Sequence, residues 1–322
     1  MGKKIALIVC VAALSALILG AFLMTGDEPI KDAGTVQNAP QKLTYKGAEY
    51  PIRKHIQTVL LIGTDSTEQY EEQTEGLRDF YNYNQADFLM LVVLDTEANT
   101  AQILQLNRDT MTDVPWLDVL GRYGGTEYKQ LCLAFNYGDG GVNSCRNTVD
   151  AVSRLIFDAP IQSYIQVPMS VIPVLNDLVG GVPVTITDDM TTVDPDFVKG
   201  ATVRLTGAQA EKFVRSRMEL KNDTNIARMR RQRDYLDSFQ KCAKEAINTD
   251  SEFVVKLLEK LGDYLQSDMT GQQLSDLITR LDHSEISPIR YPEGKLVFGG
   301  EHYEFYVDED SLWEIVKSAY CE

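Results

Sequence analysis

The sequence predicts a mixed α/β domain held behind one membrane-spanning helix. Three observations support this prediction: an uncharged apolar run near the N-terminus, short runs rich in strand-forming residues, and an arginine-rich helical segment in the second half. The chain has 322 residues, 44% hydrophobic and 24% charged, as in ordinary globular proteins. Its net charge of −16 excludes a basic field over the whole surface. We therefore expect no nucleic-acid partner and only a local anion site.

Residues 5–24 are expected to form a single transmembrane anchor. This run contains no charge, and at about 1.5 Å per residue it spans a bilayer core of roughly 30 Å. The two lysines before it predict that residues 1–4 are cytoplasmic and that the main domain is extracellular, at the cell membrane. A cleaved signal peptide is the alternative. Its apolar region is usually about 7–15 residues long and ends in an A-x-A-like site, which Ala21-Phe22-Leu23 does not provide.

Residues 25–54 are expected to be an extracellular stalk, because Asp, Gly, Pro, Gln and Asn dominate and no apolar periodicity persists. Residues 55–322 then form the folded domain. Disulfides can form outside the membrane, and the four cysteines there allow three pairings, among which the sequence does not choose. Small buried thiols are the alternative. These cysteines are Cys132, Cys145, Cys242 and Cys321.

The first half of the domain has the pattern of β-strands. Residues 58–63 form a short apolar run that ends just before Asp65. Residues 88–94 are a continuous apolar run rich in strand formers, and residues 101–106 are a second such run after the turn-like residues 95–100. The last two runs predict a β-hairpin.

The hairpin gives a geometric prediction. If its turn lets Asp95 pair with Thr100, the same register places Asp87 opposite Arg108 at the open end. Directly opposed residues have Cβ atoms roughly 4.5–5.5 Å apart, so an ion pair is expected. Asp65 would join this pair if its strand runs beside the second strand of the hairpin. A plain ion pair at a sheet edge is the alternative.

Arginines are concentrated in one part of this acidic chain. Arg215 and Arg217 share a face if the chain there is extended. The segment Asn222-Asp223-Thr224 is suited to cap a following helix. In that helix Arg228 and Gln232 lie beside an apolar stripe. Arginines next to a buried stripe suit the multidentate binding of phosphate oxygens.

Six stretches in this order resemble the LytR–CpsA–Psr family of membrane-anchored bacterial proteins. They are VLLIGTDS (59–66), ADFLMLVVLD (86–95), LQLNRDT (104–110), LAFNYGDGG (133–141), LVGGVPV (178–184), and LTGAQAEKFVRSR (205–217) followed by ARMRRQ (227–232). The resemblance covers residues 55–322 and implies one domain, an α/β/α sandwich around a central, mostly antiparallel sheet.

The resemblance also implies an activity and a site. Members of the family resemble phosphotransferases that move a glycopolymer from a polyprenyl pyrophosphate carrier to the primary hydroxyl of N-acetylmuramic acid in peptidoglycan. Asp65 and Asp87 match the family's metal-binding aspartates, whose oxygen ligands favour Mg²⁺ or Mn²⁺ over zinc. Asp65 and Asp109 are both candidates for the general base, and the sequence does not choose between them. The residues implied in catalysis are Arg108, Asp109, Arg215, Arg217, Arg228 and Gln232.

Two positions depart from the family pattern. Gln85 stands where the family usually has an arginine, and Asn225 stands where it usually has an aspartate. Arg78, in an insertion at residues 68–83, is a candidate replacement for the missing positive charge. The departures favour a first alternative function, a non-catalytic regulator or scaffold that binds polyprenyl phosphates. A second alternative is a pyrophosphate hydrolase with water as the acceptor.

Overall fold

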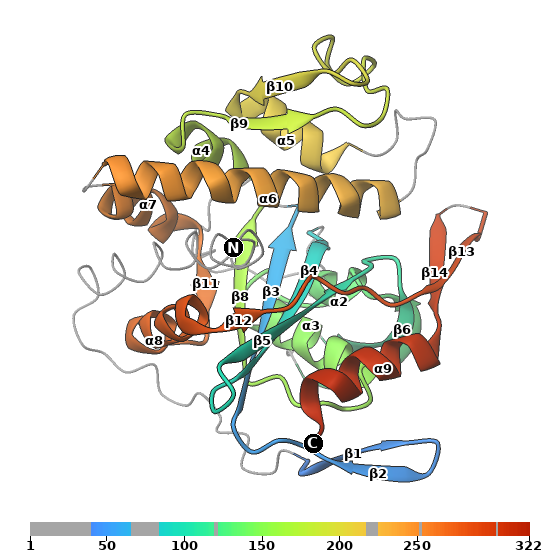
Figure 1. The fold of residues 1–322 in the computed structure, drawn as a ribbon. Helices are drawn as coiled ribbons and strands as arrows, with labels where there is room; N and C mark the ends of the chain where they lie inside the picture. Colours follow the sequence, from blue (N-terminus) through green and yellow to red (C-terminus); the bar gives the residue numbers. More distant parts are fainter. Residues whose placement is uncertain (1–39, 66–83, 119–121, 217–224, 251–252, 301) are drawn as a thin grey trace.

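The central feature of the fold is a mixed β-sheet with helices on both faces (Figure 1). The computed structural model describes residues 40–65, 84–118, 122–216, 225–250, 253–300 and 302–322. Within these residues the sheet has the strand order β11–β8–β3–β4–β5–β12. The strands are β3 (Ile56–Thr64), β4 (Ala86–Asp95), β5 (Thr100–Leu106), β8 (Ser163–Pro168), β11 (Gln266–Ser267) and β12 (Glu285–Ile286). The predicted mixed α/β class is confirmed.

The predicted hairpin is β4–β5. Its register pairs Asp95 with Thr100 and continues to Leu89 and Leu106, as expected from the sequence. The strand before Asp65, β3, pairs antiparallel with β4 and parallel with β8, while β12 lies parallel to β5. The condition considered for Asp65, that β3 runs beside β5, is not met, because β4 lies between the two strands. Asp65 still reaches the open end of the hairpin, since β3 ends where β4 begins.

Helices cover both faces of the sheet, which explains why β3 and β4 are almost continuous apolar runs. Leu60 and Ile62 of β3 pack on one face, and Val59 and Leu61 pack on the other. The first face is covered by α2 (Leu133–Asn136), α3 (Val142–Leu155) and α9 (Glu309–Tyr320), and the second by α4 (Val171–Leu178), α7 (Phe253–Leu261) and α8 (Gly271–His283).

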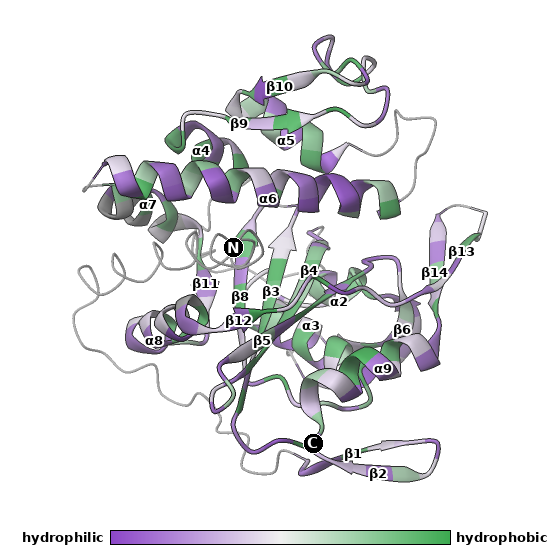
Figure 2. Ribbon diagram, viewed as in Figure 1, coloured by the Kyte–Doolittle hydropathy of each residue, from purple (hydrophilic) through white to green (hydrophobic). Residues whose placement is uncertain are grey.

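The long helix α6 (Asn225–Thr249) crosses the end of the sheet at which β3 ends and β4 begins (Figure 1). On its far side lies a smaller unit of β9 (Val182–Thr185), β10 (Thr202–Leu205) and α5 (Gly207–Arg215). Tyr235 and Phe239 of α6 join the apolar cluster of this unit. The helix α6 nevertheless carries many hydrophilic residues (Figure 2), and one of these, Arg228, donates to Asp87 of β4.

Two more hairpins lie next to each other beyond β5. They are β6 (Met111–Leu117) with β7 (Tyr123–Gln130), and β13 (Gly294–Phe298) with β14 (Tyr303–Val307). A bridge between Thr110 and Phe305 joins them. The sequence analysis did not predict either hairpin.

The predicted anchor at residues 5–24 lies outside the described residues, as does the stalk up to residue 39. Over the part of the chain that the structure describes, no helix has the length and apolar character needed to cross a bilayer.

The last part of the predicted stalk is a folded hairpin, so that part of the prediction is wrong. The strands β1 (Lys42–Tyr45) and β2 (Ala48–Pro51) pair antiparallel around Lys46 and Gly47, whose φ angles of 48° and 80° are typical of a type I′ turn. Alternate residues of β1 are buried, and the Tyr45 ring stacks on Trp313 of α9 with 4.7 Å between centroids. The polar residues between them hid this alternation in the sequence.

The four cysteines of the described residues are free thiols. Cys132, Cys145 and Cys321 are buried, and burial raises the pKa of Cys145 well above its usual value. Disulfides and free thiols were the two alternatives from the sequence, and the structure shows free thiols.

Replacing Leu43 by alanine tests the docking of the β1–β2 hairpin. Leu43 is 1% exposed, so Leu43→Ala is expected to lower the free energy of unfolding by about 2–5 kcal/mol, measured by denaturant titration. Lys42→Ala, on the exposed side of the same strand, is the control and should change it by less than about 1 kcal/mol. Equal, small effects of the two substitutions would show that residues 42–51 behave as a stalk in solution.

Candidate active site

The carboxylate of Asp87 lies between two arginines. Arg108 Nη1 donates to Asp87 Oδ1, and Arg228 Nη1 donates to Asp87 Oδ2 at 3.0 Å. The side chains of Asp87, Arg108 and Arg228 are only 9%, 8% and 3% exposed. The predicted meeting of Asp87 and Arg108 is confirmed, and an arginine from α6 joins it. Because the cluster is buried, its charges act on each other with little screening by water.

Asp109 holds Arg108 from a second side. Its Oδ1 accepts a hydrogen bond from Arg108 Nε at 3.1 Å and one from Gln130 Nε2 at 3.3 Å. Asp109 is 2% exposed, so its carboxylate orients the guanidinium and is poorly placed to meet an acceptor from outside. This geometry disfavours Asp109 as the general base.

Gln85 connects Asp65 to this cluster. Arg108 Nη2 donates to Gln85 Oε1, and the Gln85 N–H donates to Asp65 Oδ1 at 2.6 Å. An arginine at position 85 has no acceptor to offer Arg108. The glutamine therefore replaces a like-charge neighbour by a hydrogen-bond partner.

Asn225 connects α6 to the loop that carries Arg108. Its Oδ1 accepts from Arg228 Nη2 at 2.6 Å, and its Nδ2 donates to Asn107 Oδ1 at 2.5 Å. An aspartate could accept from Arg228 but could not donate to Asn107. Asn225, which the sequence analysis named only as a departure from the family pattern, and Asn107, which it did not name, are thus buried parts of the site. The signal was available for Asn107, because it stands directly before Arg108.

The other predicted residues lie in different places. Arg215 ends α5, and its Nη1 donates to Glu211 Oε1 at 2.6 Å, so this ion pair lies within the helix and outside the Asp87 cluster. Arg217 and Arg78 lie outside the described residues. Gln232 is on α6, one turn after Arg228, and is buried. Within the described residues, the structure therefore brings together Asp65, Asp87, Arg108, Asp109 and Arg228 but not Arg215.

The buried Arg231 holds the end of α5, a role that the sequence did not reveal. Its Nε donates to the carbonyl of Phe213 at 3.0 Å, and its Nη2 donates to the carbonyl of Ser216. These carbonyls belong to the last turn of α5 and to its C-cap, which helical bonds leave open. Arg231 therefore fixes the chain just before Arg217.

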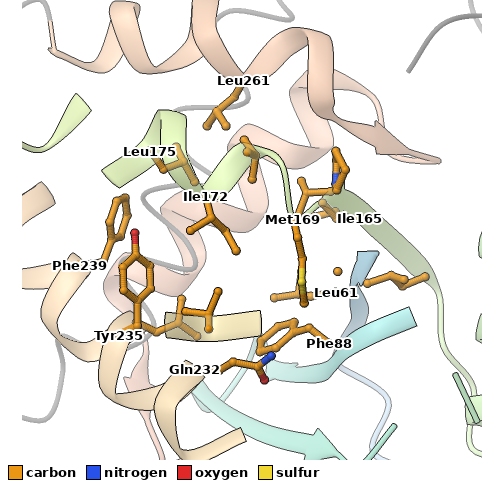
Figure 3. Close-up of a pocket in the computed structure, with 17 residues that line it drawn as sticks. Leu61, Phe88, Ile165, Met169, Ile172, Leu175, Gln232, Tyr235, Phe239 and Leu261 are labelled. Carbon is orange, nitrogen blue, oxygen red and sulfur yellow. The ribbon is translucent and has the colours of Figure 1, made fainter. Parts of the chain in front are cut away.

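An apolar cavity of about 180 Å³ is lined by residues that neighbour the ion cluster in the chain (Figure 3). Phe88, directly after Asp87, and Gln232 line it, and Figure 3 shows these two side chains next to each other. Its other walls come from β3, β8, α4 and α6; examples are Leu61, Ile165, Ile172, Tyr235 and Phe239. Burial raises the pKa of Tyr235, so its hydroxyl stays protonated and can donate to Asn176 Oδ1 at 3.4 Å.

The carboxylate oxygens of Asp65 and Asp87 are the type of ligand that a hard divalent cation such as Mg²⁺ prefers. Mg²⁺ is usually bound through one or two carboxylates, with water and substrate phosphates supplying the rest. Among the side chains that the structure describes, no group of three or more His, Cys, Asp or Glu residues is arranged to hold a metal ion. A cation here therefore needs the phosphates of a ligand, and it would share Asp87 with the two arginines.

Comparison with known proteins adds independent information. The family model for the LytR_cpsA_psr family matches residues 30–319 of this chain. A relative from Bacillus mycoides, a polyisoprenyl-teichoic acid–peptidoglycan teichoic acid transferase named TagU, is 28% identical over 220 residues, which is 68% of this chain and 62% of the relative. A Bacillus cereus protein of the same name is 33% identical over 134 residues, 42% of this chain and 39% of the relative. The chain thus spans less than two thirds of these relatives.

Solved structures show the same fold. The structure of TagT bound to LI-WTA aligns with a TM-score of 0.59 at 20% identity, covering 87% of this chain and 95% of that chain. The crystal structure of B. subtilis TagV aligns with a TM-score of 0.57 at 20% identity, covering 83% and 97%. At this identity the likeness concerns the fold alone.

Removing the carboxylate of Asp87 tests the ion cluster. Asp87→Ala leaves two buried arginines without their shared counter-ion, which is expected to lower the free energy of unfolding by about 3–5 kcal/mol. Inorganic pyrophosphate should raise the melting temperature of this variant more than that of the wild type, because it supplies the missing negative charge.

The matched control is Asp188→Ala, which breaks the more exposed ion pair with Arg230 and should cost less than about 1 kcal/mol. If both alanine variants melt alike, Asp87 does not balance the arginines as described.

Proposed function

This chain belongs to the LytR–CpsA–Psr family, and we propose that it transfers a glycopolymer from a polyprenyl pyrophosphate carrier to peptidoglycan. One observation carries the proposal: two buried arginines pair with Asp87, and the next residue, Phe88, lines an apolar cavity. The donor needs cations for its phosphates and an apolar site for its tail. The relatives from Bacillus are named teichoic acid transferases, which supports the proposed transfer reaction.

The arginines supply what the reaction requires. The acceptor hydroxyl gives its proton to a general base, and its oxygen attacks the phosphorus that carries the glycopolymer. The bond from this phosphorus to the bridging oxygen breaks, and polyprenyl phosphate leaves with the negative charge. Guanidiniums that are already oriented stabilise this charge without reorganising. Arg108 is oriented by Asp109 and Gln85, and Arg228 by Asn225. The buried network thus prepares both cations before the donor binds.

Asp65 and Asp87 would hold a divalent cation, Mg²⁺ or Mn²⁺, together with the donor's phosphates. Such an ion would neutralise developing charge on the phosphoryl oxygens. Asp65 Oδ1 accepts the hydrogen bond from the N–H of Gln85 described above.

The tail would enter the cavity between the sheet and α6. Phe88 follows Asp87 in the chain, Gln232 lies one turn after Arg228, and both line the cavity. A tail lying there places its phosphates near Arg108 and Arg228. We further propose that residues 5–24 anchor the chain in the cell membrane, with the domain on the outer side, where donor and peptidoglycan meet.

Alanine substitution of the two arginines tests the proposal. Full chain, lipid-linked donor and peptidoglycan are mixed with Mg²⁺, and polymer bound to glycan is measured. Arg108→Ala and Arg228→Ala should each lower the transfer rate about 10²–10³-fold, because each loses one oriented charge contact in the transition state. The transfer rate of Arg228→Lys should lie between the rates of the wild type and of Arg228→Ala, because lysine keeps the charge but lacks the forked shape of the guanidinium.

Arg230→Ala is the control. Arg230 pairs with Asp188 at the surface, so this substitution should leave the transfer rate unchanged. Wild-type rates in the Arg108 and Arg228 variants would remove these residues from the mechanism. Free phosphate with unmodified glycan would indicate the hydrolase, and retained intact donor would indicate the non-catalytic binder.

Removal of divalent cations tests the metal proposal separately. A chelator should abolish transfer, and Mg²⁺ or Mn²⁺, rather than Zn²⁺, should restore it. Asp65→Asn should raise the Mg²⁺ concentration needed for half-maximal rate. Full activity in the presence of the chelator would overturn the metal's role and leave the arginines as the cations at the site.

A further inference from the structure

A second cavity lies at the end of the sheet away from the Asp87 cluster, and we name it the α3–β8 cavity. Its volume is about 320 Å³, at the lower end of the roughly 300–1,000 Å³ typical of ligand pockets. Strand β8 begins in its wall at Ser163, opposite Val59, and ends at Pro168, opposite Thr64 (Figure 1). Because Thr64 directly precedes Asp65, the α3–β8 cavity and the ion cluster lie at opposite ends of β8. The transfer chemistry proposed above does not use this cavity.

One face of α3 forms a wall of the α3–β8 cavity. The residues on this face follow each other at spacings of three and four, as neighbours on a helix surface do. They are Arg146, Val149, Asp150 and Ser153. Apolar groups complete the wall after the helix and before β1, namely Pro160, Ile161 and Pro40. The cavity therefore offers both charged and apolar contacts.

Asp268 is held in a fixed orientation across the cavity from α3. The Ser267 hydroxyl donates to the Tyr164 carbonyl at 2.7 Å, and the Tyr164 N–H donates to Asp268 Oδ1 at 3.0 Å. Burial raises the pKa of Asp268, while the Tyr164 N–H and the charge of Arg146 oppose the rise. The carboxylate is thus oriented and partly desolvated, which favours a cationic partner.

The charges that line the α3–β8 cavity do not neutralise one another. Asp150 accepts from Arg154 Nε at 3.2 Å, so its charge is balanced within α3. The other charged groups in the wall are Arg146, Asp158 and Asp268, and none of them forms an ion pair with a residue that the structure describes. One guanidinium and two carboxylates therefore face the same small space.

This mixture of charges selects the chemistry of a ligand. A simple anion would meet the carboxylates of Asp158 and Asp268, and a simple cation would meet Arg146. A metal ion is also disfavoured, because the described residues contain no group of three or more acidic, His or Cys side chains arranged to hold one. A small molecule that carries one ammonium and one carboxylate satisfies both kinds of partner.

We propose that the α3–β8 cavity binds a free α-amino acid with an apolar side chain. Its ammonium group donates to Asp268 and lies near Asp158, and its carboxylate accepts from Arg146. Its side chain packs against Val149 and Ile161. This site is separate from the transfer site and does not depend on the proposed function.

Binding of L-leucine to the full chain, kept in mild detergent and without donor, tests this proposal. Ligand-detected NMR follows the titration, and two analogues that each lack one charge are compared: N-acetyl-L-leucine and L-leucinamide. L-leucine should bind at least about tenfold more tightly than either analogue, because each analogue loses one charge-assisted contact.

Substitutions in the cavity should weaken the binding of L-leucine. Asp268→Asn keeps an acceptor for the Tyr164 N–H but loses the charge, and it should weaken binding roughly tenfold. Arg146→Ala should weaken binding roughly threefold, a smaller effect because Arg146 is exposed and screened by water.

Two exposed charges outside the cavity provide matched controls. Arg122→Ala and Asp276→Asn should bind L-leucine as the wild type does. The four variants should also transfer polymer at the wild-type rate when no amino acid is added, since none of these residues lies in the Asp87 cluster.

The outcomes separate this inference from the proposed function. It is overturned if L-leucine does not bind, if either analogue binds as tightly as L-leucine, or if Asp268→Asn and Arg146→Ala bind as the wild type does. Should Asp268→Asn fail to fold, Arg146→Ala decides, because it changes an exposed side chain. A chain that transfers nothing but binds L-leucine through these two residues supports the inference and removes only the transferase.

Discussion

The salt bridges of Asp87 with Arg108 and Arg228 join three parts of the molecule that are far apart in sequence. Asp87 lies in β4, Arg108 lies in the connection after β5, and Arg228 lies in the first turn of α6. A buried carboxylate between two cations is stable only when each charge keeps its partner. The cluster therefore fixes α6 on the end of the sheet. The same requirement makes the arginines available to an anion, because their side chains are already gathered and desolvated.

The two departures from the family pattern have a physical explanation in this network. Gln85 accepts from Arg108, and Asn225 both accepts from Arg228 and donates to Asn107. A charged residue at either position would lose one of these bonds. Against the pattern that the resemblance implies, glutamine in place of arginine at position 85 and asparagine in place of aspartate at position 225 remove one charge of each sign, so the formal charge of the site is unchanged. The residues at positions 85 and 225 thus determine how Arg108 and Arg228 are held.

Much of the site followed from the sequence because it depends on local register. The turn after Asp95 sets the pairing of β4 and β5, and that pairing places Asp87 next to Arg108. Contacts between distant segments could not be predicted in this way. The insertion of β4 between β3 and β5 and the packing of Tyr45 on Trp313 both depend on tertiary arrangement. The roles predicted for Arg217 and Arg78 remain predictions, because both residues lie outside the described part of the chain.

The most direct measurement is native mass spectrometry of the full chain purified from bacterial membranes. If Arg108 and Arg228 form the binding site for a phosphate joined to a polyprenyl tail, the wild type should carry a polyprenyl phosphate or pyrophosphate. Arg228→Ala should have lost it, while Arg230→Ala should keep it. A wild type without lipid, or an Arg228→Ala variant that carries as much lipid as the wild type, would contradict the account.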